Sequence, residues 1–85
     1  MAMYFFDTDD GSSFFRDDVG VKLPDLETAK QQASLALAEI AVEAIPGTST
    51  RRELSIGVRD ERNKPVLRTK IVFEMIVVGL VDAAN

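Results

Sequence analysis

The most constraining feature of this sequence is a pair of alternating segments in its second half. Large apolar residues occupy every second position in residues 54–58, and a second alternation runs through residues 67–75. A period of two is typical of β-strands that cover a core with one face. If residues 61–64 form the turn between them, Val58 faces Leu67, Ile56 faces Thr69 and Leu54 faces Ile71. A shift by one residue would separate these apolar sets, so the pattern predicts this register.

A helix is expected before this hairpin. Asp25 can cap the free N–H groups of a first turn, and Glu27 complements the positive end of the helix dipole. Good helix formers follow as far as Ile45, where a Pro-Gly pair ends the helix. The second half of this helix is apolar on more than one side. The residues expected to face the core are Leu26, Ala29, Ala33, Leu37, Ile40 and Ala44.

Two aromatic runs near the N-terminus predict a second hairpin. The Asp10-Gly11 pair between them favours a two-residue type I′ turn, because both turn positions need positive φ. Such a turn would place Phe6 opposite Phe15 and Phe5 opposite Arg16. The connector that follows, residues 17–23, is expected to be irregular, with a turn at its glycine.

Together these elements predict an α+β fold of ββαββ order. One long helix packs on one face of an antiparallel sheet, in two layers. Eighty-five residues suffice for a single domain over residues 1–85, of which 81–85 are expected to be a frayed tail. The N-terminus lacks the basic segment of a signal peptide, and the apolar stretch 71–81 is too short to span a membrane. A cytoplasmic protein without a membrane partner is therefore expected.

The composition excludes several kinds of catalysis. The chain contains no cysteine and no histidine, so it has no thiol nucleophile, no imidazole base and no Cys/His zinc site. Its serines have no base beside them in the sequence, and it has no glycine-rich phosphate loop. Adjacent carboxylates such as Asp9 and Asp10 would point to opposite faces of a strand. We expect a non-enzyme with no catalytic residues and no cofactor.

An acidic turn offers a candidate metal site. Asp7, Asp9 and Asp18 occupy the first, third and twelfth positions expected of a calcium loop. The glycine of the turn comes one residue early, and strands rather than helices flank it. The competing interpretation is a hairpin turn with solvated aspartates.

A basic segment offers a candidate nucleic-acid surface. Residues 51–70 contain seven bases and three acids, whereas residues 1–50 sum to −6. In the predicted register Arg68 and Lys70 lie on the face away from the core and could contact a nucleic-acid backbone together with Arg59. The competing interpretation is a solvated face with weak cross-strand ion pairs. The overall net charge of −4 also argues against general nucleic-acid binding.

The chain carries more apolar surface than one helix can cover. In the predicted hairpin Tyr4, Phe6 and Phe15 share one sheet face, and Phe5 and Phe14 share the other. Beyond residue 71 the last strand is apolar on both faces. Such surplus usually marks an interface, so a homo-oligomer or a protein partner is expected, unless a bulge or the C-terminal residues cover it. The expected interface residues are Tyr4, Phe6, Phe15, Val72, Ile76 and Val78.

Several blocks of the sequence resemble a known family. They are Tyr4-Phe5-Phe6-Asp7, Asp10-Gly11, Leu23-Pro24-Asp25-Leu26, Arg51-Arg52-Glu53-Leu54, Val58-Arg59-Asp60-Glu61 and Pro65-Val66-Leu67. In this order they resemble a family of small alphaproteobacterial domains of unknown function, which implies a single bacterial, cytoplasmic domain. A second likeness is to HicB-type antitoxins, which also place Pro-Asp-Leu before a helix. Their glycine-containing loop is missing here. The alternative function that this likeness implies is a regulatory module contacting nucleic acid.

Overall fold

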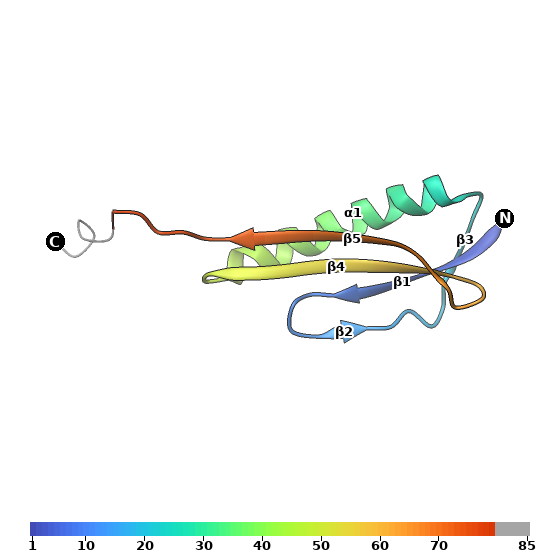
Figure 1. The fold of residues 1–85 in the computed structure, drawn as a ribbon, viewed down its shortest axis with the longest axis horizontal. Coiled ribbons are helices and arrows are strands. Elements are labelled where there is room, and N and C mark those ends of the chain that lie inside the picture. Colours follow the sequence, from blue (N-terminus) through green and yellow to red (C-terminus); the bar gives the residue numbers. More distant parts are fainter. Residues whose placement is uncertain (80–85) are drawn as a thin grey trace.

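The alternating segments form a long β-hairpin in the computed structural model, which describes residues 1–79 (Figure 1). Strand β4 covers Arg51–Asp60 and strand β5 covers Pro65–Glu74. The predicted register is confirmed: Leu54 pairs with Ile71, Ile56 with Thr69, and Val58 with Leu67. The three β4 side chains in these pairs are fully buried, because this face of the sheet lies against the helix.

The helix α1 covers Leu26–Ala44 and is followed by a short 3-10 turn, η1, over Ile45–Gly47. The predicted cap is confirmed, since the Asp25 carboxylate accepts the Thr28 N–H at 2.8 Å. Small residues let the helix lie close to the sheet. The buried residues of the core are Tyr4, Leu23, Ala29, Ala33, Leu37, Leu54, Ile56 and Val58. Leu26, expected in the core stripe, is instead exposed at the start of the helix.

Strand β1, Ala2–Asp9, lies beside β4 in the middle of the sheet. Two short strands, β2 (Phe14–Phe15) and β3 (Val21–Leu23), pair with opposite ends of β1. All pairings are antiparallel, and the order β2-β1-β4-β5 leaves β5 at one edge. The predicted α+β class is confirmed, with β3 as an additional strand.

The predicted register of the N-terminal hairpin is wrong by two residues. Phe15 pairs with Thr8 rather than with Phe6. The loop has four residues instead of two, because the Asp10 carboxylate accepts the N–H groups of Ser12 and Ser13 at 3.0 and 2.8 Å. A shift of two residues leaves every side chain on its predicted face.

The helix covers one face of the sheet only (Figure 1). We call the other face the open face. The tail expected at residues 81–85 lies outside the described residues. Within residues 1–79 no helix is long and apolar enough to cross a membrane.

Candidate functional site

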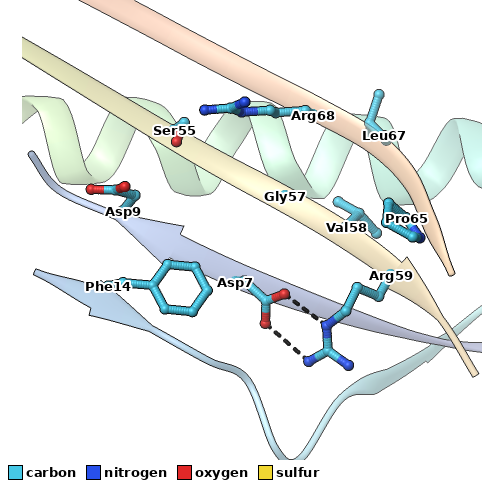
Figure 2. A pocket seen from close by; sticks show the side chains of 10 residues that line it. All are labelled: Asp7, Asp9, Phe14, Ser55, Gly57, Val58, Arg59, Pro65, Leu67 and Arg68. Atoms are coloured by element: carbon cyan, nitrogen blue, oxygen red, sulfur yellow. Dashed lines mark hydrogen bonds and ion pairs between the residues drawn. The ribbon is translucent and has the colours of Figure 1, made fainter. Parts of the chain in front are cut away.

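An ion pair between β1 and β4 lies at the centre of the open face. The Arg59 guanidinium contacts both oxygens of Asp7, with Nε at 2.7 Å and Nη2 at 3.0 Å, and each side chain is only 11% exposed (Figure 2). The hydrogen bond from Arg59 lowers the pKa of Asp7, although burial alone would raise it. The guanidinium also stacks over the Phe5 ring at 5.0 Å, so Asp7 holds its edge and Phe5 its face.

This ion pair holds the segment between β2 and β3 against β1. Asp17 donates its N–H to the Asp7 carboxylate at 2.9 Å, and its carbonyl accepts from Arg59 at 2.8 Å. Its carboxylate accepts the Phe6 N–H at 3.0 Å, in place of a backbone ladder bond. Burial would raise the pKa of Asp17, but the N–H donors of Phe6, Gly20 and Val19 lower it overall. The cluster therefore has a structural role.

The three candidate nucleic-acid residues are not equally free to contact a phosphate group. Arg59 is engaged by Asp7, and the Lys70 ammonium lies 3.6 Å from Glu53. Among residues 1–79 no carboxylate lies within 4.0 Å of the Arg68 guanidinium. Of the three candidates, Arg59 is thus neutralised by Asp7, Lys70 shares Glu53 with Arg51, and Arg68 keeps an unpaired charge among the described residues.

The three candidate metal ligands do not converge. Asp7 is bound to Arg59, the Asp9 carboxylate accepts the Gly11 N–H at 2.9 Å, and Asp18 lies 3.6 Å from Arg16. In the described part of the chain no three acidic side chains are arranged to hold a metal ion. The three aspartates are held by different partners: Asp7 by Arg59 across the sheet, and Asp9 and Asp18 by groups two residues away in the sequence.

A hollow of about 260 Å³ lies on the open face beside the ion pair (Figure 2). Its residues come from four strands, with Phe14 on β2, Asp9 on β1, Ser55 and Gly57 on β4, and Arg68 on β5. Pro65 and the exposed Phe14 ring form its apolar side.

The hollow exists because β4 carries a glycine at its centre. A Cβ atom at Gly57 would meet nothing within 4 Å, and its φ is not positive, so neither crowding nor conformation requires glycine there. Glycine in a strand interior often marks a site where another group approaches closely. Sequence reasoning missed this site, and the glycine among the outward-facing positions of this strand was the available signal.

The six candidate interface residues divide into two groups. Tyr4 is buried in the core and Phe6 packs against it, so both are corrected to core residues. Phe15, Val72, Ile76 and Val78 are exposed, the last two by 78% and 84%. Helical Leu35 and Val42 are also exposed, on the side of α1 away from the sheet.

Three of the exposed residues, Val72, Ile76 and Val78, lie on the edge strand β5 or just beyond its end. Strand β5 has no partner on its outer side within residues 1–79. Beyond it the chain runs on from the end of the strand, away from the body of the domain (Figure 1). This extension, Met75–Val78, is tied back by one backbone bond, from the Met75 N–H to the Thr50 carbonyl at 2.7 Å. It is apolar on both faces and exposed throughout.

Comparison with known proteins gives a family but no activity. Neither a curated protein nor a solved structure matches the chain. A family model described as a domain of unknown function, DUF6894, matches residues 3–72. This range takes in all the strands and the helix except the first residue of β1 and the last two residues of β5. The chain therefore belongs to the DUF6894 family of domains of unknown function.

Proposed function

We propose that this domain is a non-catalytic, cytoplasmic interaction module that self-associates through the outer edge of β5. The observation that carries the proposal is the exposed apolar extension Met75–Val78, which prolongs an unpaired edge strand. An edge of this kind is a template for pairing with another chain. A second copy offers the same edge, so the two can pair by a twofold axis.

Antiparallel pairing about an axis normal to the sheet keeps both helices on the same side. With Val72 opposite Val72 of the second copy, Lys70 lies opposite Glu74 of that copy. The extension Met75–Val78 then lies opposite residues 66–69. Each apolar residue of the extension gains a neighbour, and each Lys70 gains a carboxylate in addition to Glu53.

Neighbouring registers are poorer. An axis at Phe73 would place Lys70 opposite Ile76 and Glu74 opposite Val72, without an ion pair. An axis at Ile71 would place Pro65, which has no N–H to donate, within the paired region. An axis at Ile71 would also form an ion pair, between Glu74 and Arg68 of the second copy. Charge complementarity therefore disfavours the axis at Phe73, and backbone hydrogen bonding disfavours the axis at Ile71.

Single cysteines test this register directly, because the chain has no cysteine of its own. In the proposed pair the two Val72→Cys residues face each other at a Cα separation of about 4.5–5.5 Å, which a disulfide spans. The control is Lys70→Cys on the same strand and face, where the two cysteines are displaced by four residues, about 14 Å. Under mild oxidation we expect Val72→Cys to give a covalent dimer and Lys70→Cys to stay monomeric. Equal cross-linking of the two variants, or none, would overturn the proposal.

A further inference from the structure

We infer that the hollow on the open face binds a free α-amino acid with an apolar side chain. This inference does not depend on the β5 edge. The hollow lies over β4 and is bordered on one side by Pro65 and Arg68 of β5, and all its residues belong to one copy, so the monomer contains the whole site.

The first argument is the empty space over Gly57. A side chain there would meet no neighbour within 4 Å, so an alanine or a β-branched residue would fit. Such residues stabilise strands relative to glycine by about 0.5–1 kcal/mol. A glycine at this position therefore sacrifices stability and keeps the hollow open.

The second argument is the apolar lining. The Phe14 ring is 63% exposed and lines the hollow together with Pro65. Val58 and Leu67 also border the hollow, but their side chains pack in the core on the other face of the sheet. The volume of about 260 Å³ lies below the range of about 300–1,000 Å³ that is usual for drug-sized ligands. The space suits one apolar side chain rather than a nucleotide.

The third argument is the charge of the polar side. Arg68 has no ion-pair partner among residues 1–79, and Figure 2 shows its guanidinium directed toward Ser55 and the end of the hollow where Asp9 lies. Of the other charged groups on this face, Asp7 and Arg59 neutralise each other, and Lys70 is paired with Glu53.

The hollow thus presents one separated cation and one separated anion. The Arg68 guanidinium can bind an α-carboxylate. The Asp9 carboxylate accepts the Gly11 N–H with Oδ1 and can accept from an α-ammonium group with its other oxygen. The Ser55 side chain makes no hydrogen bond to the described residues and lines the same hollow. A zwitterion satisfies both charges, whereas a simple carboxylate would meet repulsion from Asp9 and an amine would meet repulsion from Arg68.

The test is a titration of the ¹⁵N-labelled protein with L-phenylalanine, followed through the amide shifts of Gly57, Arg68 and Phe14. Two matched ligands remove one charge each: 3-phenylpropionate lacks the ammonium group and phenethylamine lacks the carboxylate. We expect saturable shifts with phenylalanine, and dissociation constants at least about tenfold larger with either truncated ligand. Absence of saturable shifts, or equal binding of 3-phenylpropionate, would overturn the inference.

Variants locate the binding at the hollow. Gly57→Leu should fill the space and abolish the shifts of Arg68 and Phe14, while the rest of the amide spectrum stays dispersed. Arg68→Gln should weaken binding at least about tenfold through loss of the charged hydrogen bond. Lys70→Gln, the same charge change on the same strand and face, should bind like the wild type. Wild-type affinity of either Gly57→Leu or Arg68→Gln would contradict the assignment.

Discussion

Ile76→Lys is the substitution that separates self-association from folding most cleanly. Ile76 is 78% exposed in the single copy, so the change removes little packing within the chain. In the proposed dimer it lies opposite Arg68 of the second copy and becomes covered. Burial of an isoleucine contributes about 1.5–3 kcal/mol. Because an edge contact covers a side chain incompletely, we use the lower value of about 1.5 kcal/mol per copy.

The substitution occurs twice in a twofold dimer, so the expected loss is about 3 kcal/mol, before any repulsion between the new lysine and Arg68. At 1.4 kcal/mol per factor of ten, the dissociation constant should rise by at least about a hundredfold. Sedimentation velocity over a concentration series measures this constant. Thermal unfolding of the dilute, monomeric protein should change by less than about 0.5 kcal/mol.

Val42→Lys is the matched control. Val42 is a similarly exposed β-branched residue, but it lies on the outer side of α1, away from the β5 edge. It should leave the dissociation constant unchanged. If the Ile76→Lys variant dimerises as tightly as the wild type, the claim that the extension Met75–Val78 lies in the dimer interface is refuted.

Three further substitutions test individual contacts that stabilise the fold. Asp7→Asn should destabilise the fold by about 2–3 kcal/mol in urea unfolding, because Arg59 and the Asp17 N–H lose a charged acceptor. The folded chain lowers the pKa of Asp7 from its ordinary 3.8. The stability that this carboxylate contributes is therefore present above pH 3.8 and is lost as the pH falls below that value. Asp7→Asn should lose part of this acid sensitivity. Gly20→Ala should cost about 1–3 kcal/mol, since φ is +75° and the new Cβ would lie 2.7 Å from the Phe5 ring; an unchanged Tm would contradict this. Asp25→Ala should cost about 1 kcal/mol through loss of the helix cap, and an equal stability of the two proteins would argue against the cap.

Much of the fold could be predicted because its signals are local. The alternation around Leu54, Ile56 and Val58 has one register that keeps apolar residues together, and β5 adopts it. The cap at Asp25 needs only the residues of the first helical turn. Both features depend on neighbouring positions and on the period of the pattern, which a single sequence contains.

The N-terminal hairpin shows where local signals fail. The Asp10-Gly11 pair favours a two-residue turn, but the Asp10 carboxylate instead caps the N–H groups of Ser12 and Ser13 and lengthens the loop. Strand β3 was not predicted either; the segment that leads into it is held against β1 by the Asp7–Asp17–Arg59 cluster. The members of that cluster come from distant parts of the chain and meet only in the folded sheet.

The candidate sites were predicted less well than the fold for the same reason. The positive charges of residues 51–70 are visible in the sequence, but Asp7, the carboxylate that neutralises Arg59, is identified only by the pairing of β1 with β4. Tyr4 and Phe6 were expected at an interface, although the helix covers their face. The exposure of Val72, Ile76 and Val78 could be predicted, because the sequence beyond residue 71 is apolar on both faces of the strand.

The most direct test of self-association through β5 is the mass of the unmodified protein in solution, measured by native mass spectrometry and sedimentation equilibrium. The account predicts a species of twice 9.3 kDa that dissociates on dilution. A species of 9.3 kDa at every concentration up to the millimolar range would contradict it.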